Sequence, residues 1–166
     1  MAFRAAMTGH QVYSTLHTNS SIGAIPRLMD LGVLPDIMAG NIIGVIAQRL
    51  VRKLCTQCKA PYVPDPATQH LLGLEAGDER PVFQAVGCAR CDHVGYKGRM
   101  ALMEVFKLDA EIDELIARRA TGREIRTVAA ARGFRTLADD AVGRVLSGHT
   151  SLEEISRVVD LTDRVV

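Results

Sequence analysis

The stretch QVYSTLHTNSSIGAIPRLMDL, residues 11–31, places a strand-like run directly before a helical pattern. We expect a strand over residues 11–18 and a helix over about residues 21–31. Short polar side chains at positions 19–21 are N-cap candidates, because they accept hydrogen bonds from the first helical N–H groups. Strands that alternate with helices are typical of α/β proteins. The stretch therefore predicts the α/β class.

The flanking sequence continues this alternation. One feature limits it: only one strand-like run precedes the first long helix, whereas an α/β sheet needs several strands with crossover helices. We therefore expect that the N-terminal half of the sheet is missing. The further elements expected are a helix end at AFRAAM (2–7), a helix over 35–47, strands at QRLVRKL (48–54) and GRMALMEVF (98–106), and a short helix around TQHLLGL (68–74).

From Leu108 onward apolar residues recur at helical spacing, which predicts several short helices. The segments TGRE (121–124) and SLEE (151–154) fit capping boxes that begin helices, and Gly133 and Gly148 stand where helices should end. We expect residues 109–166 to form a small all-helical bundle that binds no ligand.

Composition excludes some classes of function. The chain has 166 residues, a net charge of +1 and 4% aromatic residues, so it lacks the basic, aromatic-rich surface typical of nucleic-acid binding. Its most apolar stretch, IMAGNIIGVIA (37–47), is too short to span a bilayer. No signal peptide opens the chain. These features, with the cysteine spacing described next, favour the cytoplasm.

The four cysteines of the chain form two matched pairs, CTQC at Cys55 and Cys58 and CARC at Cys88 and Cys91. Two such pairs complete a tetrahedral Cys₄ site, which is closed to substrate and therefore structural. The alternatives are two disulfides or a dithiol redox site, and both fit a cytoplasmic protein less well. We expect one zinc ion, with the nearby His93 as a surface or outer-shell residue.

The phosphate-binding patterns GxxxxGK[ST] and GxGxxG are both absent from the chain. Four other motifs are present: AAMTGHQVYSTLHTNSSIGAIPRLMDLGV (5–33), GVIAQRLVRKLCTQCK (44–59), CARCDHVGYKGRMALMEV (88–105) and LADDAVGRVLSGHTSLEEISRV (137–158). Together these motifs resemble the C-terminal part of the bacterial type II secretion and type IV pilus assembly ATPases.

The resemblance implies a domain organisation. Residues 1–108 would be the C-terminal portion of a RecA-like ATPase domain with the tetracysteine zinc insert at 55–91, and residues 109–166 the helical bundle. In that family the domain forms a hexameric ring that works with an inner-membrane platform and uses ATP and Mg²⁺ to drive pilin or pseudopilin polymerisation. The chain would then be cytoplasmic and peripheral at the inner membrane.

The segment TGHQVYSTLHTN (8–19) matches the family's His box, with His10 and His17 on its two histidines. Ligands of open α/β sheets lie beyond the carboxyl ends of strands, where His17 is followed by Thr18 and Asn19 at a helix start. His10 would lie at the other end of the same strand, about 20 Å away. We therefore favour His17 as the catalytic phosphate partner, while His10 orders the strand or meets a neighbouring subunit. A structural role for both histidines is the alternative.

Arg49 and Gln48 are the second candidate for nucleotide contact, since a guanidinium group suits phosphate oxygens well. The alternative for Arg49 is a surface salt bridge. Arg52 and Lys53 are expected to be solvated at the edge that leads to the zinc site. His70 and His149 are expected at the surface.

The chain departs from the family by having no Walker A, Asp box or Walker B motif. The resemblance therefore implies a C-terminal fragment or a truncated homologue, inactive by itself as an ATPase. Two other classes remain open: a zinc-binding protein-interaction module without nucleotide function, and a nucleic-acid-binding zinc ribbon, which the composition disfavours. The sequence does not distinguish a secretion machine from a pilus machine.

Overall fold

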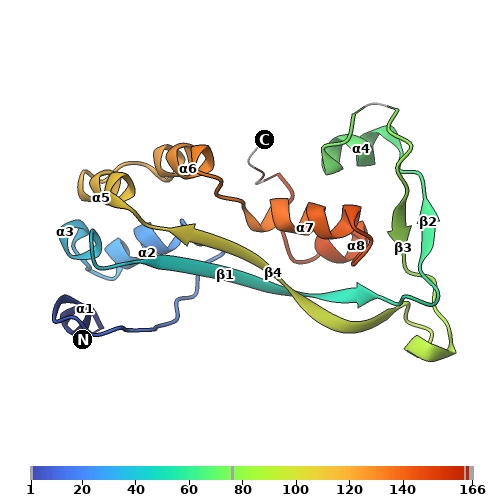
Figure 1. Cartoon of the computed structure of the whole chain (residues 1–166), viewed down its shortest axis with the longest axis horizontal. Helices are drawn as coiled ribbons and strands as arrows, with labels where there is room; N and C mark the ends of the chain where they lie inside the picture. Colours follow the sequence, from blue (N-terminus) through green and yellow to red (C-terminus); the bar gives the residue numbers. More distant parts are fainter. Residues whose placement is uncertain (1, 76, 163, 165–166) are drawn as a thin grey trace. The chain divides into compact units, whose positions relative to one another are not determined.

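The computed structural model describes residues 2–75, 77–162 and 164, and its elements are labelled in Figure 1. The chain divides into two compact units, each built from an earlier and a later segment. The first unit comprises Met1–Ala47 and Glu104–Arg135, and the second comprises Gln48–Met103 and Thr136–Val166. This grouping does not follow the boundary expected at residue 108, and that domain division stays a prediction.

The first unit is mainly helical. Helix α5 packs against α3 and α6, because Ile112, Leu115 and Ile116 recur at helical spacing and are buried on one face. Phe106 and Ile25 are buried in the same core cluster, and Phe106 makes an edge-to-face contact with the ring of Phe134. The helices of this unit are α1 (Ala2–Met7), α2 (Ala24–Asp30), α3 (Pro35–Met38), α5 (Ala110–Ala117) and α6 (Gly122–Ala131).

The second unit carries the cysteines. Strands β2 (Ala60–Tyr62) and β3 (Val82–Gln84) pair antiparallel, with Pro61 opposite Phe83. Helix α7 contacts both β3 and α8. The remaining elements of this unit are helix α4 (Pro66–Leu72), the 3₁₀ helix η1 (Ala89–Cys91), and helices α7 (Leu137–Leu146) and α8 (Leu152–Ile155).

Two long strands, β1 (Gly44–Leu54) and β4 (Tyr96–Lys107), form a separate two-stranded sheet. Each strand contributes residues to both units. The sequence-based strands at residues 48–54 and 98–106 are thus confirmed and lie within longer strands. The protein is mixed α/β with small sheets, as expected, and its relation to the RecA-like fold stays a prediction.

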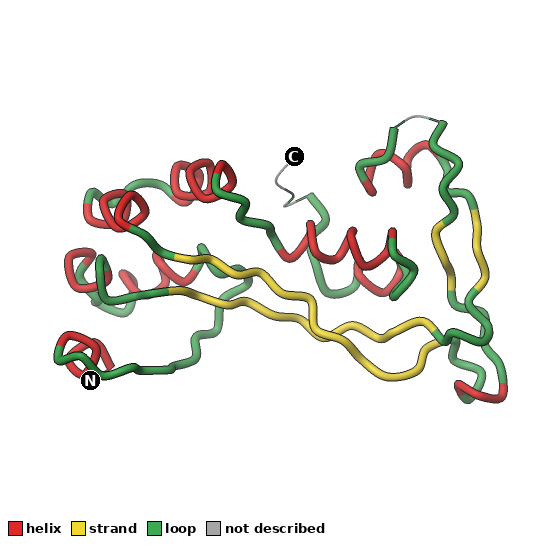
Figure 2. Tube along the Cα trace, viewed as in Figure 1, coloured by secondary structure: helices red, strands yellow, loops and turns green. Residues whose placement is uncertain are grey.

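The strand expected over residues 11–18 is wrong. These residues form no regular secondary structure (Figure 2), and the side chains of all but Thr18 are exposed. Alternation of apolar and polar residues predicts a strand only where a neighbouring strand supplies hydrogen bonds. In the part of the chain that the structure describes, no strand pairs with this segment.

The helix expected over residues 35–47 is wrong in its second half. Helix α3 ends at Met38, and Gly40 has a φ of 73°, which ends the helical path. Strand β1 begins at Gly44 and includes the β-branched residues Val45 and Ile46. A short apolar run does not distinguish a buried helix from a strand by periodicity alone.

The helix starts and ends of the C-terminal region are largely confirmed. Thr121 and Glu124 form a reciprocal capping box, and Gly133 and Gly148 have positive φ values at helix ends. Helices α5 and α6 belong to the first unit and α7 and α8 to the second, so packing of all four as one bundle stays a prediction. No helix among the described residues is long and apolar enough to cross a membrane.

Candidate metal centre and His-box segment

The four cysteine side chains meet at one point of the second unit. Their sulfur atoms all lie within 4.8 Å of one another. The Sγ–Sγ distances are 4.0 Å for Cys55 and Cys88, 3.8 Å for Cys58 and Cys91, and 3.8 Å for Cys88 and Cys91. A tetrahedral site with Zn–S bonds of ~2.3 Å separates its sulfurs by about 3.8 Å. The cluster therefore has the dimensions of a closed four-thiolate metal site.

Backbone geometry explains how the second cysteine pair turns inward. Gly87 has a φ of 117°, and a Cβ there would lie 2.5 Å from the carbonyl oxygen of His93. Gly95 has a φ of 77°, and a Cβ there would lie 2.6 Å from the Cβ of Ala85. The loops on either side of the CARC motif thus pack so closely that only glycine fits both positions.

Backbone N–H groups point at the sulfur atoms, as they do around metal-bound thiolates. Gly87 N–H donates to Cys58 Sγ at 3.3 Å, and Gly95 N–H donates to Cys91 Sγ at 3.3 Å. Cys88 N–H donates to Cys91 Sγ at 3.2 Å. These donors stabilise negative charge on sulfur, which is the form that binds a metal.

The thiols of the cluster differ in acidity. Burial acts to raise the pKa of Cys91, but the backbone N–H groups of Cys88 and Gly95 outweigh it and lower the pKa to about 7. Burial raises the pKa of Cys58 to about 12. Cys91 therefore ionises more readily than Cys58, and a bound cation would stabilise the thiolate form of the cluster. The four cysteines could hold a metal ion, and His93 is exposed and outside this cluster.

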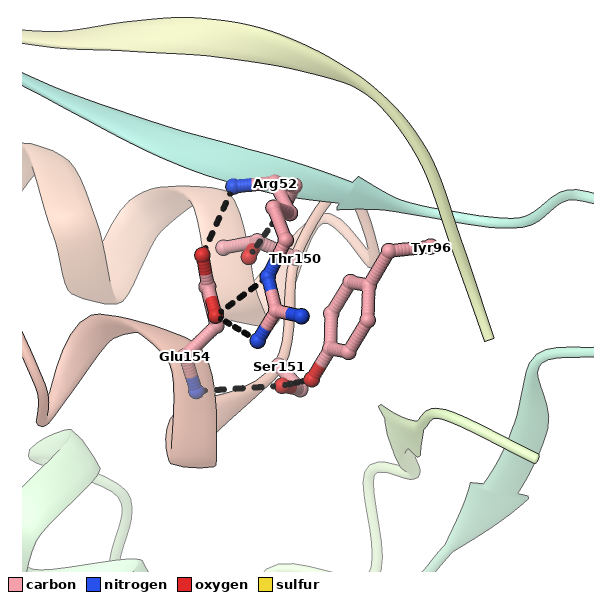
Figure 3. Close-up of polar contacts among 5 residues, drawn as sticks. All are labelled: Arg52, Tyr96, Thr150, Ser151 and Glu154. Atoms are coloured by element: carbon pink, nitrogen blue, oxygen red, sulfur yellow. Dashed lines mark hydrogen bonds and ion pairs between the residues drawn. The ribbon is translucent and has the colours of Figure 1, made fainter. Parts of the chain in front are cut away.

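The C-terminal segment is bound to strand β1 just before the first cysteine pair (Figure 3). Thr150 Oγ1 donates to the carbonyl of Arg52 at 2.8 Å. Leu54 N–H donates to the carbonyl of His149 at 2.9 Å. The carboxylate of Glu154 accepts hydrogen bonds from both the backbone N–H and the guanidinium of Arg52. The tail therefore fixes the strand that delivers Cys55.

Tyr96 completes this cluster from strand β4. The guanidinium of Arg52 lies over the Tyr96 ring at 4.2 Å from its centroid, which is a favourable cation–π arrangement. The Tyr96 hydroxyl and Ser151 Oγ lie 2.6 Å apart, and Ser151 Oγ also accepts the N–H of Glu154. Arg52 and Lys53 were expected to be solvated: Lys53 is exposed, and the Arg52 side chain is 39% exposed but is also bound to Glu154, which was not expected. The box expected at SLEE forms only by half, because the Glu154 carboxylate is bound to Arg52.

The His-box segment of the first unit is attached at both of its ends. At the first end, His10 N–H donates to the carbonyl of Ala5, and Thr8 Oγ1 lies 3.1 Å from His10 Nδ1. At the second end, Thr18 Oγ1 donates to the carbonyl of Ser20 at 3.0 Å. His10, His17 and Asn19 are exposed, and Thr18 is half-buried. The nucleotide contacts expected of these residues stay predictions.

A buried carboxylate holds Ser21, two residues after this segment. Glu104 Oε1 accepts the backbone N–H of Ser21 at 2.6 Å and the Ser21 hydroxyl at 2.5 Å. Both residues are buried, with exposed fractions of 2% for Glu104 and 0% for Ser21. Sequence reasoning missed this pair, and its only signal was an acidic residue inside the apolar strand GRMALMEVF.

Arg49 and Gln48 lie on strand β1 in the second unit. Arg49 is half-buried, and its guanidinium donates to the carbonyl of Gln48 at 3.0 Å. Gln48 is exposed. The contact with a nucleotide expected of these two residues also stays a prediction.

The chain matches the family model described as "Type II/IV secretion system protein" over residues 1–157. Because the match covers most of the chain, the protein belongs to this family. This agrees with the resemblance seen in its motifs.

Curated relatives come from both kinds of machine. The chain is 41% identical to "Type IV pilus assembly ATPase PilB" of Thermus thermophilus over 93% of its own length and 18% of the relative. It is 39% identical to "Type II secretion system ATPase E" of Vibrio cholerae and 42% identical to "Type II secretion system protein E" of Pseudomonas aeruginosa, in each case over 95% of the chain and 31% of the relative. The chain thus spans less than a third of the length of these relatives.

Proposed function

We propose that this chain is the C-terminal part of an ATPase that drives pseudopilin or pilin polymerisation in a type II secretion or type IV pilus machine. The observation that carries the proposal is the family match over residues 1–157, which includes the whole His box and all four cysteines. Proteins whose names include the word ATPase match 93–95% of the chain. The activity belongs to the longer protein, since the chain has no Walker A or Walker B motif.

In this proposal His17 contacts the γ-phosphate or the attacking water of bound ATP. Phosphoryl transfer depends mainly on positioning and on neutralisation of charge, and an imidazole donor at the phosphate serves both. Thr18 and Asn19 would contribute polar groups beside it, and Arg49 with Gln48 would supply further contacts to the nucleotide. His10, which is bonded to the preceding turn, would order the start of the segment.

The other parts have supporting roles. Cys55, Cys58, Cys88 and Cys91 would hold one structural zinc ion, which would supply no open position for chemistry. The exposed apolar side chains of Val12, Tyr13 and Leu16 support a contact with further protein, such as other subunits of a hexameric ring. The complete protein would act in the cytoplasm at an inner-membrane platform.

A chimaera tests the proposal. Residues 1–157 replace the matching region of the Thermus thermophilus relative, and Mg²⁺-dependent ATP hydrolysis is measured for the chimaera and for the isolated chain. We expect turnover only in the chimaera. His17→Ala should slow turnover about 100-fold and weaken ATP binding by less. His149→Ala, which changes another exposed histidine, is the control.

Two results would contradict the proposal. Hydrolysis by the isolated chain that disappears in His17→Ala would mean that the chain holds a complete site. A folded, metal-loaded chimaera without turnover would instead favour the second candidate, a metal-binding interaction module without nucleotide function. The four-cysteine cluster by itself is consistent with that candidate.

A further inference from the structure

Glu104 is a buried carboxylate, and the packing of the core does not require a charged side chain at this position. It lies on the buried face of strand β4 together with Phe106, whereas Val105 and Lys107 between and after them are exposed. Burial of a carboxylate costs several kcal/mol, and an apolar side chain of similar size would fill such a place without this cost. A carboxylate here is therefore explained by what it binds.

Glu104 binds Ser21, which lies two residues after the His-box segment. One carboxylate oxygen of Glu104 accepts both the N–H and the hydroxyl of Ser21. The two distances are 2.6 and 2.5 Å, and both residues are buried, so water competes little with either bond. Two donors of one residue on one oxygen fix both the position and the direction of the chain at Ser21.

We call the contact of Glu104 with Ser21 the clamp. Local hydrogen bonds link it to the residues that precede Ser21. Gly23 N–H donates to Ser20 Oγ at 3.1 Å, and Thr18 Oγ1 donates to the carbonyl of Ser20. Thr18 is the residue next to His17. Within the described residues, positions 11–17 form no backbone hydrogen bond. The position of His17 is therefore set from the Ser21 side.

We propose that Glu104 is the positioning residue for His17 and acts on it through Ser21. The inference rests on the proposed function of His17 for its effect on catalysis. Glu104 is itself buried and does not contact the nucleotide. Its loss would loosen the end of the His-box segment that is nearer to His17, so that the imidazole would spend less time where charge develops on the γ-phosphate.

The first test uses the isolated chain. In Glu104→Gln, we expect faster hydrogen exchange at the Ser21 amide and changed NMR signals of the His17 imidazole, with the metal content unchanged. Glu114→Gln, which changes an exposed carboxylate of the same unit, is the matched control and should alter neither signal. Unchanged His17 signals in a folded Glu104→Gln protein would overturn the proposal.

The second test uses the chimaera. Glu104→Gln should lower kcat about 10- to 100-fold with KM for ATP changed less than about threefold, because positioning matters most in the transition state. In the His17→Ala background the same change should have almost no further effect on kcat, since Glu104 acts through His17. A full additional loss in that background would mean that Glu104 acts on the fold in general and would overturn the proposal.

A conservative variant adds a control for folding. Ser21→Ala keeps the backbone N–H but removes the hydroxyl, so its effect on kcat should lie between wild type and Glu104→Gln. An effect of Ser21→Ala equal to that of Glu114→Gln would contradict the clamp. The positioning claim is decided in the isolated chain, so an inactive chimaera would overturn the proposed function without deciding this inference.

Discussion

Glu154 binds Arg52 at two places, its backbone N–H at 2.9 Å and its guanidinium Nε at 2.9 Å, although 102 positions separate the two residues. The side chain of Glu154 is 8% exposed and that of Arg52 is 39% exposed, so the carboxylate is shielded from water while the guanidinium is partly solvated. Because this carboxylate binds both the backbone and the side chain of Arg52, it links helix α8 to strand β1. The second unit therefore depends on its C-terminal segment for the placement of β1.

Replacement of Glu154 should measurably destabilise the protein. Glu154→Gln removes the charge that the guanidinium of Arg52 binds, and we expect a loss of about 1–3 kcal/mol in the free energy of unfolding. Urea unfolding followed by circular dichroism measures this loss. Glu153→Gln, at the exposed neighbouring position, is the control and should change stability by less than about 0.5 kcal/mol. Equal effects of the two substitutions would contradict the role of the pair.

Glu154 should also make the free energy of unfolding depend on pH. Its hydrogen bonds with Arg52 lower the pKa of Glu154 below the usual value of about 4.3. Because the folded-state pKa is depressed, this contribution is complete above the unfolded-state pKa and is lost as pH falls through the folded-state pKa. The stability difference between wild type and Glu154→Gln should therefore shrink below about pH 4. A difference that stays constant from pH 7 to pH 3 would show that the carboxylate charge contributes nothing.

The purified chain should contain one zinc ion. Structural zinc supplies on the order of 10 kcal/mol to small metal modules, so its removal by a chelator should unfold the region around β2 and β3. Elemental analysis and NMR spectra before and after chelation measure both effects. Cys58→Ser should lower zinc affinity, and reloading with zinc should restore the wild-type spectrum. Absence of metal, or disulfides among the four cysteines of the purified protein, would refute the prediction.

Gly95 should tolerate no side chain. Gly95→Ala places a Cβ 2.6 Å from the Cβ of Ala85 at a φ of 77°, and we expect a loss of about 2 kcal/mol together with weaker zinc binding. Thermal unfolding and a zinc competition assay measure the two effects. Gly122→Ala is the control, because a Cβ at Gly122 meets nothing within 4 Å and the residue begins helix α6. If both variants match wild type in stability and zinc affinity, the loops on either side of the CARC motif do not pack as closely as described.

Local patterns in the sequence predicted the cysteine cluster well. The spacing of two residues inside each pair determines a tight turn that brings the two thiols together. The pairing of Cys55 with Cys58 and of Cys88 with Cys91 was therefore predictable without knowledge of the fold. The capping box at Thr121 was predictable for the same reason, because its partner lies only three residues away. The paired spacing of the two cysteine motifs also indicated that they share one site.

Contacts between distant residues were not predictable in this way. Ser21 and Glu104 are 83 positions apart, and no local pattern specifies that a strand carboxylate will meet a particular serine. Glu154 fitted a capping box in the sequence, but in the structure Arg52 competes successfully for its carboxylate. The strand expected around His17 failed for a related reason, since a strand exists only with a partner that its own sequence does not contain.

The attachment of the C-terminal segment to β1 has a consequence for the order in which the protein is made. Synthesis proceeds at about 5–20 residues per second, so Glu154 leaves the ribosome several seconds after Cys91. During this interval Arg52 has no carboxylate from the tail, and strand β1 lacks the hydrogen bonds of His149 and Thr150. Metal binding by the four cysteines, as proposed, would then help to secure this end of the strand before the tail is available. Nascent chains made under zinc limitation should accordingly be the ones most exposed to proteases.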